Sequence, residues 1–325
     1  MKKNNVLIIV LVIALLAVLT SCFYYLKINS QKRELSSDAL IVGNNYPFTV
    51  EDAMEYTVTI EKEPQRIISL SPGATEILFA VGSGDRVIAV SEFCTYPPEV
   101  KELPKVGGYT NPSIEKITAL KPDLVVAMRG NDRETIQKLR ELKINVITFD
   151  PISIYSLNEA LSIIGKVTNG KNADDLIKDI NYSIDSVKTK GEALEFHPKV
   201  LFLFSPDGAL YSAGPNSHID EMITIAGGKN IAHDATSAWP QLSMEVVSAK
   251  NPDVILITSQ NMGAGEELSL EKVRADFKAD KKWKHIAAVK NNNVFFVSND
   301  EICTLSPRSI NELDKMYDIF KNIQK

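Results

Sequence analysis

The chain has 325 residues, enough for two ordinary domains, and carries a formal net charge of −5 with an isoelectric point near 5.6. Its 44% hydrophobic and 24% charged residues are typical of globular proteins, which excludes a largely disordered chain and a collagen-like or coiled-coil fibre. The acidic balance without a Lys/Arg block argues against nucleic-acid binding, and three Cys are too few for a disulfide scaffold.

The N-terminus differs from the rest of the chain. Lys2 and Lys3 precede an apolar run over residues 6–19, which has the length of a signal-peptide core and falls short of the about 20 residues that span a bilayer. The run ends in Leu-Thr-Ser-Cys, which resembles the lipobox of bacterial lipoproteins. This pattern predicts that Cys22 is lipidated and anchors the chain to the outside of the cell membrane.

The corresponding boundaries are a signal peptide over residues 1–21 and a lipid-attachment and tether segment over residues 22–46. Residues 27–45 are polar and lack a sustained period, as expected of a tether. Residues 23–26 are uncharged, so an uncleaved membrane anchor over residues 4–26 is the alternative.

After a short alternating segment that predicts a hairpin near residues 48–60, apolar runs alternate with segments of helical periodicity. Alternation of this kind predicts parallel sheets flanked by helices. The longest helix is expected over residues 172–190, where apolar residues form one stripe. The predicted strands are 66–69, 86–90, 123–127, 145–149, 200–204, 254–258 and 294–298.

The second half of the chain repeats part of the first. Residues 113–126 align with residues 243–256 without a gap, with Ser, Glu, Ala, Pro and Asp at matching positions. Glu76 and Glu221 each precede a Gly by six residues. The repeat predicts two similar α/β lobes, with a ligand bound between them at the carboxyl ends of their strands.

The segment RIISLSPGATEILFAVG at residues 66–82 begins a series of motifs that extends to the C-terminus. In order, these motifs resemble the helical-backbone substrate-binding proteins of ABC importers, which carry iron–siderophores, haem and cobalamin. The other matching segments are 85–91, 96–99, 103–108, 111–115, 120–125, 226–231, 239–245, 283–295 and 306–308.

This resemblance implies two lobes joined by one long helix: an N-terminal lobe over residues 47–168, a connecting segment over 169–195 and a C-terminal lobe over 196–325. It implies a monomer that delivers its ligand to an ABC permease dimer with ATPase subunits. Glu76 and Glu221 are expected at the outer rims of the lobes, where they would pair with arginines of the permease.

The segment from Phe93 to Pro98, followed by Val-Gly-Gly-Tyr, is most similar to the cobalamin-binding branch. A corrinoid is large and partly polar, which suits aromatic side chains with polar tips. No resident cofactor is expected, although the ligand would itself contain cobalt or iron. The predicted ligand-binding residues are Phe93, Cys94, Tyr96, Tyr109, Phe204, Trp239 and Arg308.

Other ligands remain open at this point. A negatively charged ferric siderophore would favour Arg129 and Arg308, and haem would favour an iron ligand such as Tyr109. A bare metal ion is disfavoured because all four His lie in the second half of the chain. His218 and His233 are interpreted as capping or surface residues.

Cys94 and Cys303 are interpreted as small buried residues, although a disulfide between them is compatible with an oxidising compartment. An enzyme is the rival class, but no GxSxG, HExxH or phosphate-loop motif occurs. The chain is therefore not expected to be an enzyme. A ligand sensor would need the same fold as an importer component.

Overall fold

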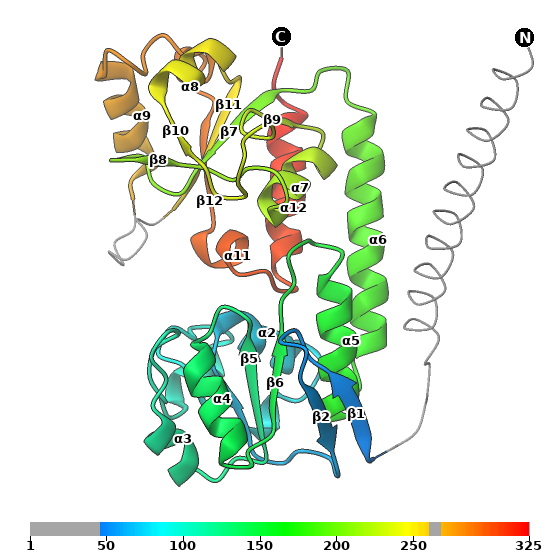
Figure 1. The fold of residues 1–325 in the computed structure, drawn as a ribbon. Helices are drawn as coiled ribbons and strands as arrows, with labels where there is room; N and C mark the ends of the chain where they lie inside the picture. Colours follow the sequence, from blue (N-terminus) through cyan, green and yellow to red (C-terminus); the bar gives the residue numbers. More distant parts are fainter. Residues whose placement is uncertain (1–45, 260–267, 325) are drawn as a thin grey trace, which may run out of the picture. The chain divides into compact units, whose positions relative to one another are not determined.

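The structure, a computed structural model, describes residues 46–259 and 268–324 (Figure 1). The predicted signal peptide, the lipidation site Cys22 and the tether up to residue 45 lie outside the described residues. The described residues form one compact unit. Within the described part, no helix is both long and apolar enough to cross a membrane.

The N-terminal lobe begins with an antiparallel hairpin, β1 (Phe48–Glu51) and β2 (Thr57–Ile60), at the predicted position. A parallel four-stranded sheet follows, in the order β4-β3-β5-β6. Its strands are β3 (Ile67–Ser69), β4 (Val87–Val90), β5 (Leu124–Met128) and β6 (Val146–Phe149). The helices of this lobe are α2 (Pro72–Ala80), α3 (Ile114–Ala119), α4 (Arg133–Glu141) and α5 (Leu157–Thr168), with short 3-10 turns η1 (Gly84–Arg86) and η2 (Pro98–Glu102).

The C-terminal lobe has a second parallel sheet, in the order β12-β11-β7-β9. Its strands are β7 (Lys199–Leu203), β9 (Lys229–Asn230), β11 (Val254–Thr258) and β12 (Val294–Val297). A short antiparallel pair lies beside it, β8 (Leu210–Tyr211) and β10 (Gln241–Leu242). The helices are α7 (His218–Ile225), α8 (Met244–Lys250), α9 (Leu270–Ala279), α10 (Ala287–Lys290), α11 (Asn299–Cys303) and α12 (Ser309–Phe320).

The two sheets share one topology. In each sheet the first strand in sequence lies between the second and the third, and the fourth lies at the edge beyond the third. Ser113 and Ser243 occupy the same place in the two lobes, because each accepts a backbone N–H at the start of its helix. The internal repeat predicted from sequence is therefore a structural repeat.

The repeated Pro-Asp pair has a structural role. The Asp123 carboxylate accepts the backbone N–H groups of Gln65 and Arg66, just before β3. Asp253 accepts the N–H of Lys199 at the start of β7. Each aspartate thus satisfies backbone donors at the beginning of the first strand of its sheet.

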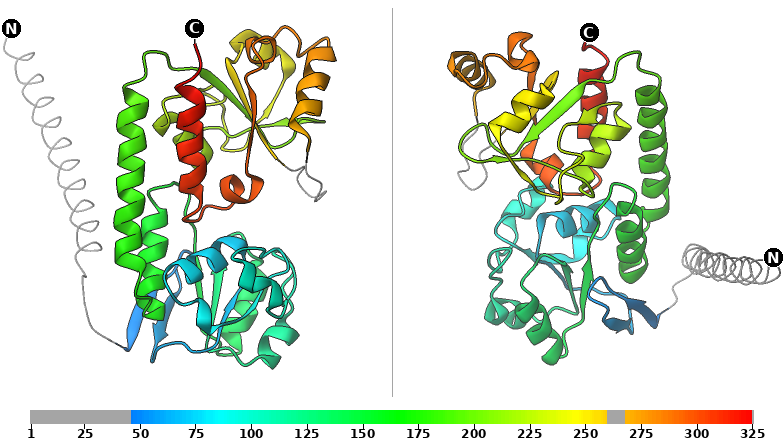
Figure 2. Two further views of the ribbon diagram at one scale, coloured as in Figure 1. Left: turned by 180° about the vertical axis from the view of Figure 1, so that it is seen from behind. Right: turned by 45° about the horizontal axis from the view of Figure 1, so that its top comes forward.

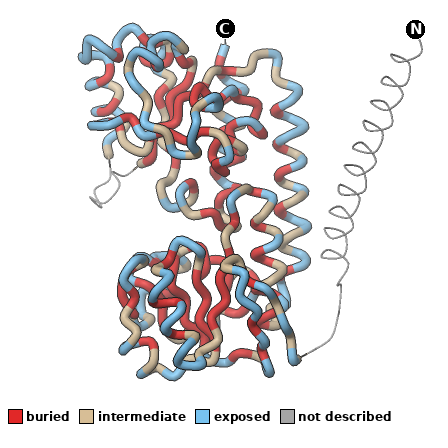
Figure 3. The backbone as a smooth tube through the Cα atoms, in the orientation of Figure 1, coloured by how far each residue is buried: buried red, intermediate tan, exposed pale blue. Residues whose placement is uncertain are grey.

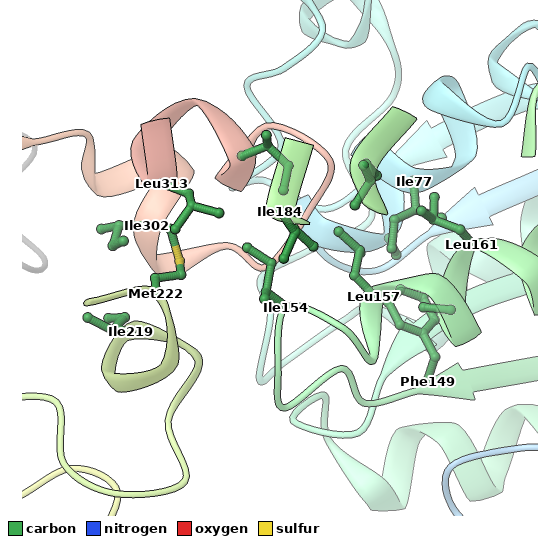
Figure 4. Close-up of a cluster of buried hydrophobic side chains, with 14 of the residues drawn as sticks. Ile77, Phe149, Ile154, Leu157, Leu161, Ile184, Ile219, Met222, Ile302 and Leu313 are labelled. Atoms are coloured by element: carbon green, nitrogen blue, oxygen red, sulfur yellow. The ribbon is translucent and has the colours of Figure 1, made fainter. Parts of the chain in front are cut away.

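The long helix α6 (Ala173–Glu192) connects the lobes and occupies the helix predicted over residues 172–190. Its apolar stripe belongs to a buried cluster that includes residues of both lobes. In Figure 4, Ile154 and Ile184 lie between Ile77 of the first lobe and Leu313 of the second. The views of Figure 2 show α6 alongside both lobes, and Figure 3 shows buried residues throughout both sheets. One hydrophobic cluster therefore extends through both lobes, and each lobe has a further cluster of its own.

Candidate ligand-binding site

A cavity of about 570 Å³ opens in the C-terminal lobe. Phe204, directly after β7, and Cys303, at the end of α11, place it at the carboxyl end of the sheet, where open α/β folds bind ligands. Among the described residues, Asp207 is the only acidic or basic side chain lining it apart from His218. The lining residues are Phe204, Ser205, Asp207, Ala209, Tyr211, His218, Ile219, Trp239 and Cys303.

Aromatic rings form much of the cavity wall. The rings of Phe204 and Trp239 lie 5.6 Å apart at a tilted angle, and Phe204 also packs edge-on against Phe202 at 4.9 Å. Trp239 is nevertheless 48% exposed, so its indole has a free face. A half-exposed aromatic ring at a cavity can cover a large, flat ligand. Phe204 and Trp239 thus lie together, as sequence analysis predicts.

His218 is the most buried polar side chain of the cavity, with 8% of its surface exposed. It is the first residue of α7, and its Nε2 lies 2.7 Å from the carbonyl oxygen of Ile302. Its ring also packs edge-on against Trp239 at 6.0 Å. Desolvation lowers the pKa of His218, so the imidazole is neutral at neutral pH. His218 therefore belongs to the cavity, whereas the sequence interpretation placed it at the surface or at a helix cap.

Cys303 and Cys94 are both free thiols, so the structure contains no disulfide between them. Cys303 is exposed in the cavity, yet burial of its sulfur raises its pKa to about 12, with a smaller contribution from Asp300. Cys94 is 2% exposed, and its sulfur contacts the hydroxyls of Thr75 and Ser91 at 3.1 Å. Cys94 is thus enclosed within the N-terminal lobe and does not line this cavity, and its contact with a ligand stays a prediction.

The predicted aromatic residues of the N-terminal lobe do not line this cavity. Phe93 is 61% exposed and Tyr96 is also exposed. Tyr109 is partly buried, and desolvation, followed by the charge of Asp150, raises its pKa. The backbone oxygen of Tyr109 accepts a hydrogen bond from Asn131 at 2.7 Å. The structure leaves Phe93 and Tyr96 accessible and does not bring them together with Phe204 and Trp239.

Arg308 binds the N-terminal lobe instead of lining the cavity. Its Nη2 and Nε lie 2.5 and 2.8 Å from the two carboxylate oxygens of Glu76. Its guanidinium also stacks on the ring of Tyr96, 3.9 Å from the centroid. The Glu76 hydrogen bond, followed by its charge, raises the pKa of Arg308 further. That Arg308 binds ligand stays a prediction, and in the structure its Nε and Nη2 donors are engaged by Glu76.

Glu76 itself lies between the lobes rather than at an outer rim, which corrects the predicted position. It is 5% exposed and also accepts a hydrogen bond from the Ser306 hydroxyl at 2.6 Å. Glu221 makes a second contact between the lobes, accepting the backbone N–H of Ile154 at 2.6 Å. Desolvation raises the pKa of Glu221, and the charge of Asp220 adds to this shift. We call the Glu76–Arg308 and Glu221–Ile154 contacts the two clasps.

The sequence of residues 67–301 matches the family described as periplasmic binding protein. The chain belongs to this family. Among curated relatives, an uncharacterized ABC transporter substrate-binding lipoprotein of Bacillus subtilis is 33% identical, covering 83% of this chain and 84% of the relative. A vitamin B12-binding protein of Vibrio parahaemolyticus is 28% identical, covering 83% and 94%.

Solved structures of this periplasmic binding protein family agree with the fold. The periplasmic vitamin B12-binding protein BtuF of Vibrio cholerae is 27% identical, with a TM-score of 0.66 over 81% of this chain and 98% of that one. The periplasmic haem-binding protein RhuT of Roseiflexus is 26% identical, with a TM-score of 0.69 over 80% and 98%. This periplasmic binding protein is the substrate-binding component of an ABC importer, and not an enzyme.

The site residues that sequence reasoning missed include His218, Tyr211 and Cys303. His218 and Cys303 are 85 positions apart in the chain, and their segments meet through the hydrogen bond from His218 to Ile302 and through the packing of Ile302 in the same cluster as Ile219. Two features of the sequence could have indicated these residues. Ser217 begins α7 by accepting the N–H of Asp220, and Cys303 follows β12. A residue that follows the carboxyl end of a strand in such a sheet is a candidate for the ligand site.

Proposed function

We propose that this binding protein captures a corrinoid, a cobalamin-like ligand, outside the cytoplasm and delivers it to the permease of an ABC importer. The supporting observation is a cavity with an aromatic wall and little charge. Among the described residues that line it, Asp207 is the one acidic side chain, and His218 is neutral. Corrinoids carry mainly neutral amide groups around a flat macrocycle, so they match such a wall better than a strongly anionic ligand does. The vitamin B12-binding relatives and the BtuF fold support the same ligand class.

The alternative ligand is haem or a ferric siderophore, which the haem-binding RhuT relative favours. Both ligands carry anionic groups that Arg side chains commonly bind. The two arginines considered from sequence have carboxylate partners, since Arg308 pairs with Glu76 and Arg129 lies 3.5 Å from Asp150. These pairings favour the neutral corrinoid over the anionic alternatives.

Isothermal titration calorimetry of the protein with cyanocobalamin, dicyanocobinamide, haemin and a ferric hydroxamate siderophore tests the proposal. We expect sub-micromolar binding of at least one corrinoid, about −8 kcal/mol or stronger, with Trp239→Ala weakening it roughly thirtyfold. Buried aromatic anchors commonly contribute about 2 kcal/mol or more. Tyr182→Ala, an exposed aromatic on α6, is the control. If haemin or the siderophore binds and neither corrinoid does, the ligand is haem or a ferric siderophore and the corrinoid proposal is wrong.

We also propose that the chain is held at the outer face of the membrane through lipidated Cys22. The Bacillus subtilis relative is described as a lipoprotein, and Cys22 follows Leu-Thr-Ser. Palmitate labelling of cells should mark the wild-type chain and leave Cys22→Ser unlabelled. A labelled Cys22→Ser chain would contradict lipidation at Cys22, and an unlabelled wild type would support the uncleaved anchor over residues 4–26.

The partner that receives the ligand is proposed to be an ABC permease that presents arginines to Glu76 and Glu221. Glu221 is partly exposed and accessible to such a partner. Glu76 is buried against Arg308, so a permease arginine would have to replace Arg308. Docking through Glu76 therefore requires that its clasp opens.

A further inference from the structure

The cavity contains an imidazole with one nitrogen fixed and the other unpaired. The Ile302 carbonyl can only accept a hydrogen bond, so the Nε2 of His218, 2.7 Å away, carries the proton. In a neutral ring, the other nitrogen, Nδ1, then has a lone pair. Nδ1 has no hydrogen-bond partner within residues 46–259 and 268–324.

Nδ1 of His218 is not one of the fully buried side-chain atoms that lack a partner, so this nitrogen keeps some accessible surface although the residue is nearly buried. His218 lines the cavity with 8% of its surface exposed. Its ring is also restrained by Trp239, at 6.0 Å between ring centroids. A restrained imidazole with N–H bound to a carbonyl and its other nitrogen free is the arrangement that metal-binding histidines show.

Cys303 adds a second donor to the same wall. It directly follows Ile302, whose carbonyl holds His218, and both Cys303 and His218 line the cavity. Its thiol has a pKa of about 12 and is protonated at neutral pH, which makes it a weaker metal ligand than a thiolate. Of the two donors, the imidazole is ready to bind a metal without losing a proton.

We infer that His218 coordinates the cobalt of the captured corrinoid through Nδ1, so that this site selects a corrinoid with an open axial position. The inference rests on the proposed corrinoid function. In the binding step a cobalt–nitrogen bond forms, the bond from cobalt to an axial water breaks, and the water leaves to solvent. No electron is transferred and no proton moves, because Nδ1 already carries a lone pair.

Aquocobinamide, which lacks the nucleotide base of cobalamin, is the probe. Its visible spectrum should change on binding, whereas dicyanocobinamide, with both axial positions filled, should bind without a spectral change. With the cobalt reduced to Co(II), electron paramagnetic resonance should show splitting by a single axial nitrogen. We expect His218→Gln to abolish the spectral change and weaken aquocobinamide binding about tenfold or more, with a smaller effect on the binding of dicyanocobinamide.

Cys303→Ser is the matched control and should retain the nitrogen splitting. His218→Gly leaves space for free imidazole, which should restore the spectral change and also separates coordination from a folding defect. Aquocobinamide bound with its water in place, or nitrogen splitting that survives in His218→Gln, overturns the inference. If the spectral change is lost in Cys303→Ser but kept in His218→Gln, the Cys303 thiol is the axial ligand of cobalt and the inference is overturned. If no corrinoid binds the wild type, the proposed function itself fails.

Discussion

Cys303 and Cys94 differ in accessibility but share a raised thiol pKa. Burial raises the pKa of both, that of Cys303 to about 12. Because only the thiolate reacts, alkylation of Cys303 should be slow at neutral pH and accelerate about tenfold per pH unit up to pH ~9. Peptide mapping after iodoacetamide treatment of the native protein should find Cys303 modified and Cys94 protected.

A bound corrinoid should slow the modification of Cys303, since this residue lines the cavity. Cys94 provides an internal control, because it should react only after unfolding. Faster labelling of Cys94 than of Cys303 in the native protein, or a Cys303 rate independent of pH, would contradict this account of the two thiols.

For individual residues, sequence reasoning located part of the candidate site. Phe204 and Trp239 are found because they are large aromatics close to recognisable elements. The burial of Cys94 could not be predicted, because a small residue in a loop after a strand gives no indication of which side it faces. The pairing of Arg308 could not be predicted because its partner, Glu76, is 232 positions away. A cationic side chain beside a predicted cleft does not reveal whether it binds a ligand or a carboxylate of the other lobe.

Helices and strands long enough to show a hydrophobic pattern are predicted well, whereas very short helices and strands are not. The strands of both sheets that contain three or more residues coincide with predicted apolar runs, because these runs are buried on both faces. The two-residue strands β8, β9 and β10 and the short helices α10 and α11 were not predicted. These elements contain too few residues to show a period, and yet β8 and α11 contribute Tyr211 and Cys303 to the cavity.

The Glu76–Arg308 clasp joins α2 to the segment before α12, and its loss should destabilise the protein. The side chains of Glu76 and Arg308 are 4% and 19% exposed. Removing one partner leaves the other charge poorly solvated, so Glu76→Gln and Arg308→Leu should each lower the free energy of unfolding by about 3 kcal/mol. Urea unfolding followed by circular dichroism measures this change.

The double variant distinguishes a true pair from two independent contacts. Glu76→Gln combined with Arg308→Leu should cost less than the sum of the single changes, by about 1 kcal/mol or more. Lys178→Gln is the control, because Lys178 and Asp175 form an exposed pair on α6 and the loss of this pair should have a small effect. Strict additivity would show that Glu76 and Arg308 stabilise the fold separately.

For the whole molecule, the shared core predicts that both lobes unfold together. Ile184 of α6 is fully buried and belongs to the cluster that connects the lobes (Figure 4). Trp239 and Trp283 both lie in the C-terminal lobe, so their fluorescence reports on that lobe, whereas circular dichroism reports on both. We expect the two signals to give one coincident unfolding transition.

Ile184→Ala should shift that transition by about 2–5 kcal/mol in both signals, because it leaves a cavity between the lobes. Lys188→Ala, at an exposed position on the next turn of α6, should have little effect. A fluorescence transition separated from the circular dichroism transition would mean that the lobes unfold independently.

Docking through Glu76 and Glu221 would require that both clasps, the Glu76–Arg308 and Glu221–Ile154 contacts, break when the protein binds the permease. If Glu76 docks the permease and Arg308 competes for its carboxylate in the free protein, substitutions of Glu76 and of Arg308 must change the affinity for the permease in opposite directions. Arg308→Gln should free the Glu76 carboxylate and strengthen binding to permease in lipid nanodiscs, whereas Glu76→Gln should weaken it. A purely structural clasp predicts that both variants change docking in the same direction, because either one loosens the same contact. Added salt should also slow wild-type association, since carboxylate–guanidinium attraction between partners is screened.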